Sequence, residues 1–354
     1  MLQRSAFAVP GDLSAPTGGY RYDRSLLHAL RAAGWDMQHV PLPGGFPFAG
    51  PAQMQTAIDA LTAVPADRPL IVDGLAYGAL PTAALDRVSA PVLALVHHPL
   101  AHETDMPAPD ARRLRALERA NLARAAHVIV PSPHIRDVLM SDYGVDAGRV
   151  TVLRPGRPEP PARPAPGRPE GPPLILSVGL LHPRKGHDVL ISALARLAGR
   201  PWQAVIAGPP WEAGHDAALE EQIGTAGLRG RIRLAGRVGQ QELARLYGRA
   251  DVFALATRYE GYGIVFDEAL VHGLPIVSTT AGAVPGTVPP EAGTLVPPDD
   301  PEAFAAALCP LLADTAVRAD KAQAARRAGA ALPSWTDAAG VAGALLERVA
   351  RDRA

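Results

Sequence analysis

The sequence contains a single cysteine, Cys309, among its 354 residues. One thiol excludes an internal disulfide, and it also excludes cysteine-rich zinc and iron–sulfur sites. Such scarcity is typical of proteins in the reducing cytosol. Cys309 lies in the apolar helical stretch Ala-Ala-Leu-Cys-Pro-Leu-Leu. We therefore expect it to be a buried packing residue.

Long apolar runs and net charge are also absent. No stretch reaches the roughly 18 apolar residues of a transmembrane helix, and the segment that starts at Met1 lacks the apolar region of a signal peptide. Thirty-five basic and thirty-five acidic residues cancel, so no overall field attracts nucleic acid. We expect a cytoplasmic protein without a nucleic-acid partner; peripheral contact with the inner face of a membrane stays open, as does the oligomeric state.

Two common nucleotide-binding fingerprints are missing. No G-x-G-x-x-G occurs anywhere in the chain, which argues against a nicotinamide dinucleotide site. The one Arg-Lys-Gly stretch, at residues 184–186, continues with His187 and so lacks the Gly-Lys-Ser/Thr of a Walker loop. A phosphate-binding site in this chain must be built in another way.

Short apolar runs alternate with stretches of helical length. Continuous rather than alternating hydrophobicity predicts strands covered on both faces, as in parallel sheets. The order βαβα indicates an α/β, doubly wound architecture. The expected strands are Ser5–Val9, Leu70–Asp73, Val92–Val96, Val128–Val130, Val150–Leu153, Leu174–Val178, Ala204–Ala207, Ile232–Leu234, Val252–Leu255, Ile276–Ser278 and Thr294–Val296.

A proline-rich segment divides the chain. Between Arg154 and Pro173 the sequence holds too little apolar surface to fold alone, and it predicts an extended spacer. The expected domains are residues 1–155, a linker at 156–172, a second domain at 173–334, and a C-terminal helix at 335–354 that packs on one of the two domains.

The most informative stretch runs from Tyr259 to Pro275 and contains two glutamates. Glu260 and Glu268 are eight residues apart, about 12 Å along a helix. That separation exceeds the roughly 5–9.5 Å of paired hydrolytic carboxylates, and it suits opposite ends of one elongated ligand. The alternative is a helix-terminal acid and a solvated one.

This stretch, Glu-Gly-Tyr-Gly-Ile-Val-Phe-Asp-Glu-Ala-Leu followed by Gly-Leu-Pro-Ile-Val, resembles the E-x7-E segment of retaining family 4 glycosyltransferases. The resemblance implies the GT-B fold, in which two Rossmann-like domains face each other across a cleft. It also implies an acceptor-binding first domain and a nucleotide-sugar-binding second domain. Glu268 would bind the ribose and Glu260 the transferred sugar. Backbone groups of the intervening loop would contact the sugar and the diphosphate: Gly261, Tyr262, Gly263, Ile264 and Val265.

A second loop carries adjacent cations. It begins at Gly179, after a predicted strand, and places Arg184 and Lys185 before a helix, where a diphosphate is favoured. In the family the matching residues stabilise the leaving diphosphate. The alternative is a solvated Arg-Lys pair.

Two further assignments rest on the resemblance. Arg237 and Val238 follow a strand and match a turn beside the nucleobase; Gly18 and Gly19 match a Gly-Gly loop near the donor phosphate. An ordinary strand-to-helix loop is the alternative for Arg237 and Val238. One departure concerns Gly286, which stands where relatives often have a glutamate, so any contact made by that carboxylate is lost.

Histidines follow the strand that starts at Val92. Relatives place a histidine here, near the reacting centre, and we choose His98 over its neighbour His97. With His102 and Glu103 these residues form no established zinc spacing, so we expect no metal and no cofactor. Packing or loop capping by either histidine is the alternative.

The helix Asp110–Ala126 carries five arginines. Some relatives use a basic helix in this domain on anionic lipid. We expect a solvated face instead, with Glu118 pairing near the arginines.

The sequence thus predicts a retaining glycosyltransferase that moves a sugar from a UDP-, GDP- or ADP-linked donor to a hydroxyl of a glycan, lipid or small molecule. We expect no covalent intermediate. The competing hypotheses are a GT-B sugar-nucleotide epimerase and a catalytically silent sugar-nucleotide-binding protein.

Overall fold

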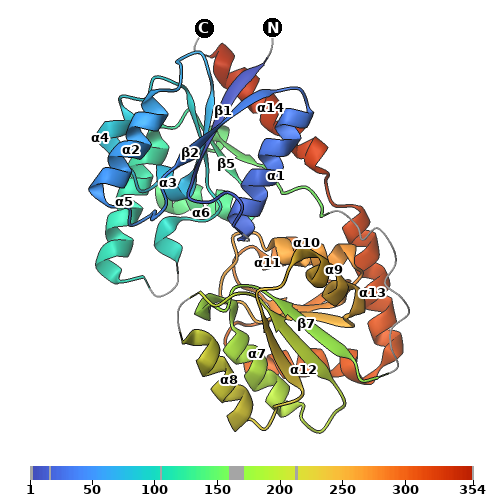
Figure 1. Ribbon diagram of the computed structural model, residues 1–354. Coiled ribbons are helices and arrows are strands. Elements are labelled where there is room, and N and C mark those ends of the chain that lie inside the picture. The colour runs from blue at the N-terminus through green and yellow to red at the C-terminus, as the bar shows by residue number, and fades with distance from the viewer. Residues whose placement is uncertain (1–2, 16, 104–105, 159–170, 212–213, 353–354) are drawn as a thin grey trace. The chain divides into compact units, whose positions relative to one another are not determined.

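The computed structural model describes the whole chain except residues 1–2, 16, 104–105, 159–170, 212–213 and 353–354. Figure 1 shows two compact units. Unit 1 comprises Met1–Gly156 with Pro333–Ala354, and unit 2 comprises Arg157–Leu332. The proline-rich segment expected as a linker lies mostly outside the described residues.

Unit 1 contains a six-stranded parallel sheet in the order β2-β1-β3-β4-β5-β6. Its elements are β1 (Arg4–Pro10), α1 (Gly18–Ala32), β2 (Asp36–Leu42), α2 (Pro51–Thr62), β3 (Leu70–Asp73), α3 (Gly74–Tyr77), α4 (Thr82–Leu85), β4 (Val92–Leu95), η1 (Leu100–His102), α5 (Ala108–Arg124), β5 (His127–Val130), α6 (Pro133–Tyr143), η2 (Ala147–Arg149), β6 (Val150–Val152) and α14 (Trp335–Arg351).

Strand β2 is the one strand of this sheet that the apolar runs do not predict. It pairs with β1 along its full length but lies at the sheet edge, and its residues alternate between exposed and buried positions. An edge position also tolerates Pro41, which has no N–H to donate. Continuous apolar runs identify strands buried on both faces, so they miss an edge strand of this kind.

The C-terminal helix α14 belongs to unit 1 and packs along α1 (Figure 1). The ring of Trp335, at its first residue, meets Tyr22 of α1 edge-on at 5.5 Å between centroids. Near its other end Arg348 donates to His127 of β5 at 3.0 Å. The chain therefore returns to unit 1 after completing unit 2.

Helix α5 turns its arginines outward, as expected, but not its glutamate. Arg112, Arg113 and Arg115 are exposed, whereas Glu118 is 1% exposed. Its Oε2 accepts the Leu100 N–H at 3.0 Å, so the expected surface pairing of Glu118 with the arginines is wrong. Burial raises the pKa of Glu118 to about 8.

We predict that Glu118→Gln changes the pH dependence of stability. Between its unfolded pKa, near 4.5, and about 8, the folded state holds a proton on Glu118 that the unfolded state has released. The stability contributed by this group is therefore lost as pH rises through that window. From pH 6 to 8.5 the wild type should lose about 2 kcal/mol relative to Glu118→Gln. Parallel denaturant unfolding of both proteins measures this difference; a pH-independent difference contradicts it.

Unit 2 contains a second six-stranded parallel sheet, in the order β12-β11-β10-β7-β8-β9. Its elements are β7 (Leu174–Val178), η3 (Pro183–Lys185), α7 (His187–Arg196), β8 (Gln203–Ala207), α8 (His215–Thr225), β9 (Ile232–Gly236), α9 (Gln240–Arg249), β10 (Val252–Leu255), α10 (Ile264–Val271), β11 (Ile276–Thr279), α11 (Val284–Thr287), β12 (Gly293–Val296), α12 (Pro301–Ala313) and α13 (Thr315–Ala330).

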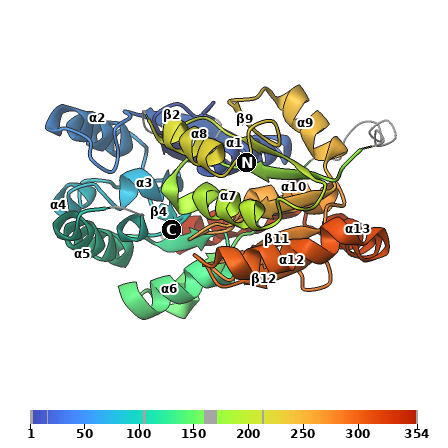
Figure 2. The ribbon, with the colours of Figure 1, turned by 90° about the horizontal axis from the view of Figure 1, so that it is seen from below.

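Helices cover both faces of this sheet. Buried residues of α7, α8 and α12 form one apolar cluster with the strands, and those of α9, α10 and α13 form a second. Figure 2 shows α7 and α12 side by side. Cys309 packs against the first cluster but is half-buried, less than the full burial expected. Among the described residues, no helix combines the length and apolar character needed to cross a membrane.

Candidate functional site

The strand order of the unit 2 sheet is one that creates a crevice for a ligand. Read from β9, the strands run third, second, first, fourth, fifth and sixth in this unit. Ligands of such sheets bind beyond the carboxyl ends of the strands, where the order reverses. That point lies between β7 and β10, and the loops that follow these two strands contain the cations and Glu260.

The loop after β7 holds its cations in a short helical turn, η3. His182 caps this turn, with its Nδ1 accepting the Arg184 N–H at 3.0 Å. Gly186 then adopts φ +62°, and a Cβ on it would lie 1.9 Å from the carbonyl oxygen of Ala256. Only glycine fits this left-handed and crowded position. It brings the cationic loop directly against the end of β10.

Arg258 ties the two loops together. Its guanidinium forms a bidentate ion pair with Asp188 of α7, at 2.7 and 3.0 Å. It also donates a hydrogen bond to Asp299 at 2.7 Å. Its backbone N–H donates to the Arg184 carbonyl at 2.7 Å. The Arg184 guanidinium in turn donates to the Tyr259 carbonyl at 3.2 Å. The position of the cations is thus fixed by bonds that the sequence pattern does not reveal.

Lys185 and Glu260 form a buried ion pair. Lys185 Nζ lies 2.6 Å from Glu260 Oε1, and their side chains are 13% and 6% exposed. Burial alone would raise the pKa of Glu260, but the charges of Lys185 and Arg184, with hydrogen bonds from Lys185 and Thr257, outweigh it and hold that pKa below its usual value. Glu260 is therefore an ionised acceptor beside a cation.

Helix α10 carries Glu268 but not Glu260. The helix begins at Ile264, with Gly263 as its N-cap, so the 12 Å helical rise expected between the two glutamates does not apply. Glu268 is 5% exposed, and its Oε2 accepts the Tyr247 hydroxyl at 2.8 Å. The His272 ring stacks on Tyr247 at 5.0 Å. Tyr247 thus holds the carboxylate of Glu268 from the side of α9.

Other predicted residues of unit 2 lie near the same sheet edge. Arg237 is exposed and Val238 is half-buried, directly after β9. Gly179 follows β7 and donates to the Ala207 carbonyl at 3.0 Å. Gly286 is exposed in α11.

In unit 1, the predicted Gly-Gly pair starts α1. Thr17 caps the helix, Gly18 is its first residue, and a Cβ on Gly19 would lie 3.3 Å from the ring of His97. The preceding Pro16 is outside the described residues. Gly19 thus lets α1 approach the loop after β4.

The two adjacent histidines have different surroundings. His98 Nε2 lies 3.1 Å from Glu103 Oε2 at the surface, with the His98 side chain 26% exposed. His97 Nε2 lies 2.8 Å from the buried Asp23 and 3.7 Å from Asp73. The preference for His98 stays a prediction, but His97 is the histidine that the fold brings to Gly19. Both histidines lie beyond the end of β4, which ends at Leu95.

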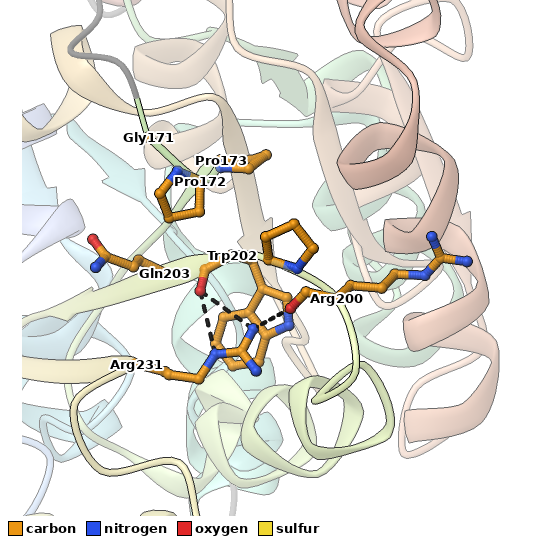
Figure 3. A pocket seen from close by; sticks show the side chains of 8 residues that line it. Gly171, Pro172, Pro173, Arg200, Trp202, Gln203 and Arg231 are labelled. Carbon is orange, nitrogen blue, oxygen red and sulfur yellow. Dashed lines mark hydrogen bonds between the residues drawn. The ribbon is translucent and has the colours of Figure 1, made fainter.

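A cavity of about 490 Å³ lies at the opposite end of the strands of the unit 2 sheet, near the amino ends of β7 and β8 (Figure 3). Arg231 stacks over the Trp202 ring at 3.8 Å, and its guanidinium donates to the carbonyls of Ala198, Arg200 and Trp202. The guanidinium of Arg231 therefore holds neighbouring backbone segments together. The cavity is remote from the site described above.

Several side chains that form these contacts were not predicted from the sequence: Thr257, Arg258, Asp188 and Tyr247 in unit 2, and, separately, Asp23 and Asp73 in unit 1. Each acts through a contact between elements distant in sequence. The one local signal was Asp73, an acid at the carboxyl end of a predicted strand.

Comparison with known sequences matches both parts of the chain. The profile of the family described as "Glycosyl transferases group 1" matches residues 159–328, and "Glycosyltransferase Family 4" matches residues 35–158. A D-inositol 3-phosphate glycosyltransferase of Xylanimonas cellulosilytica is 31% identical over 250 residues, which are 66% of this chain. The match spans 59% of that relative's length.

Solved structures with low sequence identity share the fold. Sucrose-phosphate synthase from Thermosynechococcus elongatus has a TM-score of 0.83 at 23% identity, covering 98% of this chain and 99% of its own. HepE of Anabaena, solved with UDP and glucose, has a TM-score of 0.80 at 17% identity, covering 98% and 100%. Two parallel Rossmann-like sheets in the GT-B manner, with matches to both halves of the chain, lead to one conclusion: this chain belongs to the group 1, or family 4, glycosyltransferases, a retaining family.

Proposed function

We propose that this protein transfers a sugar from a nucleoside-diphosphate donor to a hydroxyl acceptor, with retention of the anomeric configuration. The observation that carries the proposal is the Lys185–Glu260 pair, at 2.6 Å, where the strand order of the unit 2 sheet reverses. A cation for the diphosphate and an ionised acceptor for sugar hydroxyls stand side by side there. No other described ion pair of this unit joins the loops after β7 and β10 so deeply buried.

Different residues bind different parts of the donor. Arg184 and Lys185 stabilise the charge that develops on the leaving diphosphate, and the amino end of α10, residues 262–265, faces the same anion. Glu260 binds hydroxyls of the transferred sugar, and Glu268 binds the ribose. Arg237 and Val238 contact the nucleobase. Unit 1 contributes contacts with the donor and the acceptor through Gly18, Gly19 and His98.

The leaving phosphate serves as the base in this proposal. A front-face route lets a phosphate oxygen take the proton of the acceptor hydroxyl as the bond to the sugar carbon breaks. It needs no protein nucleophile, and the charge of Glu260, a buried carboxylate beside the cations, is neutralised by Lys185. A trapped covalent glycosyl–enzyme adduct would overturn the route.

The name of a relative supports one class of acceptor. The Xylanimonas protein is named for D-inositol 3-phosphate, so we propose a polyol or inositol-type hydroxyl acceptor, free or in a lipid headgroup. Incubating the protein with UDP-, GDP- and ADP-sugars, each with and without inositol phosphate, tests this. Release of nucleotide only when acceptor is present supports transfer; interconversion of the donor without acceptor supports an epimerase instead.

The role of Glu268 gives a sharp prediction. Glu268→Ala should weaken binding of the nucleoside diphosphate about 10- to 100-fold, because two charge-assisted hydrogen bonds to the ribose are lost. The same variant should bind the 2′,3′-dideoxy analogue as the wild type does. Titration calorimetry with both nucleotides measures the difference. Equal losses with both would show that Glu268 acts on the fold and not on the ribose.

A further inference from the structure

Three titratable side chains meet at the strand-order reversal of unit 1. Asp23 lies in α1, Asp73 ends β3, and His97 follows β4. Asp23 is 0% and Asp73 is 3% exposed. His97 Nε2 lies 2.8 Å from Asp23 Oδ1 and 3.7 Å from Asp73 Oδ2. The parallel neighbours β1, β3 and β4 bring these residues to one edge.

Two buried carboxylates without a cation are too costly to stay ionised together. With both ionised, Asp23 Oδ2 has no hydrogen-bond partner. When Asp73 carries a proton, its carboxyl group can donate a hydrogen bond to the Asp23 carboxylate, which accepts it. Burial raises the pKa of Asp23 to about 7, and burial with the neighbouring Asp23 charge raises the pKa of Asp73 well above its usual value.

His97 is neutral in these surroundings, because burial lowers its pKa. Its contact with the carboxylate of Asp23 requires Nε2 to carry the ring proton, and a neutral ring then has an unprotonated Nδ1. The ring is also fixed sterically. Tyr22 meets it edge-on at 5.2 Å, and Gly19 lies against it. Asp23 thus sets the tautomer of His97, and Tyr22 and Gly19 restrict the orientation of its ring.

We propose that Asp23 and Asp73 share one proton and act as positioning residues for His97, which offers Nδ1 as an acceptor to a hydroxyl of a substrate sugar. The inference rests on the proposed glycosyl transfer. Asp73 also caps α3 through Oδ1, which accepts the Leu75 N–H at 2.6 Å. Its other oxygen is therefore the one available to the shared proton.

The experiment compares Asp73→Asn with Asp73→Ser. Both keep a side chain that caps α3. Asparagine also places an N–H donor where the shared proton lies, whereas serine is too short to reach Asp23. We expect Asp73→Asn to keep kcat within about threefold and Asp73→Ser to lose at least about tenfold, as expected when a histidine loses its orienting partner. Donor KM should change in neither. Glu118→Gln, which replaces a buried carboxyl elsewhere in unit 1, is the matched control and should keep the wild-type kcat and donor KM.

A pH profile adds a readout that a structural role would not move. The wild type should lose kcat/KM on the alkaline side as the pair gives up its proton, and Asp73→Asn should lack that limb, because an amide does not ionise. Tyr20 on α1 lies close enough to Asp23, Asp73 and Asp12 for their charges to act on its hydroxyl. Burial, with the charges of Asp73, Asp23 and Asp12, raises the pKa of Tyr20 to about 12.

Nitrogen-15 spectra of the histidine rings test the tautomer without any activity measurement. With His97→Gln used for assignment, His97 should be the neutral Nε2-protonated form near pH 7 in the wild type and in Asp73→Asn.

Three results would overturn the inference: the Nδ1-protonated tautomer, wild-type activity in Asp73→Ser, or one tightly bound metal ion per chain whose removal by EDTA abolishes activity. Failure of the proposed function is distinguishable. In that case the wild type binds no nucleoside diphosphate in calorimetry, whatever the state of His97.

Discussion

Replacing Lys185 by methionine should lower kcat at least about 100-fold, since Lys185 is the cation that stabilises the departing diphosphate in the proposed reaction. Methionine keeps most of the length of the side chain and removes its charge. The other side chains of the loop stay bonded as before, because Arg184 and Arg258 hold it through separate contacts. The loss should therefore fall on kcat more than on donor KM.

The same substitution also removes the counter-ion of Glu260, so it affects the stability of the protein as well as kcat. A buried carboxylate left without its partner costs about 3–5 kcal/mol or takes up a proton. Lys185→Met should thus be less stable than the wild type. The double variant Lys185→Met with Glu260→Gln removes both charges and should recover stability, but it should not recover kcat. The two effects of Lys185 are separated in this way.

A matched control exists because the chain has only one other lysine, Lys321. It lies in α13, donates to the Gly293 carbonyl at 2.9 Å and has no role in the proposed site. Lys321→Met should keep wild-type kcat. If Lys185→Met turns over like Lys321→Met in steady-state assays, the diphosphate role of Lys185 is wrong.

Gly186→Ala should cost at least about 2 kcal/mol in the free energy of unfolding of unit 2, with a loss of activity of similar size to that of Lys185→Met. The new Cβ meets two penalties. The residue has φ +62°, which disfavours any L side chain by about 1–2 kcal/mol, and the Cβ would lie 1.9 Å from the Ala256 carbonyl oxygen. The loop must move away from β10, and its cations move with it.

Gly199→Ala is the control for this prediction, because a Cβ there meets nothing within 4 Å. Denaturant unfolding and donor titration of the two variants should separate them clearly. Equal stability and equal donor affinity would show that the loop tolerates a displaced Gly186, and the fixed geometry argued for the site would be contradicted.

The fold was largely predictable from the sequence, because buried parallel strands appear as short continuous apolar runs. Leu70–Asp73, Leu174–Val178 and Val252–Leu255 agree with the structure to the residue. Strand β2 was not predicted because the residues of this edge strand alternate between exposed and buried positions. Glu118 was misplaced because helical spacing shows which residues share a face, but not that an acid on that face accepts a backbone N–H from another element.

The candidate site was predictable in its local parts only. Glu260, Glu268 and the Arg184–Lys185 pair lie in continuous motifs, and the structure brings Lys185 to Glu260. The contacts that hold them come from elsewhere: Tyr247 lies 21 residues from Glu268, and Arg258 lies 70 from Asp188. The grouping of Asp23, Asp73 and His97 depends on strand order, which a motif does not contain.

In the proposed reaction a nucleoside diphosphate binds where β7 and β10 end. A crystal structure of the protein with UDP or GDP tests it most directly. We predict phosphates in contact with Arg184 and Lys185 and the ribose on Glu268. A nucleotide bound elsewhere, for instance in the cavity beside Trp202 and Arg231, with the two loops unoccupied, would contradict the account.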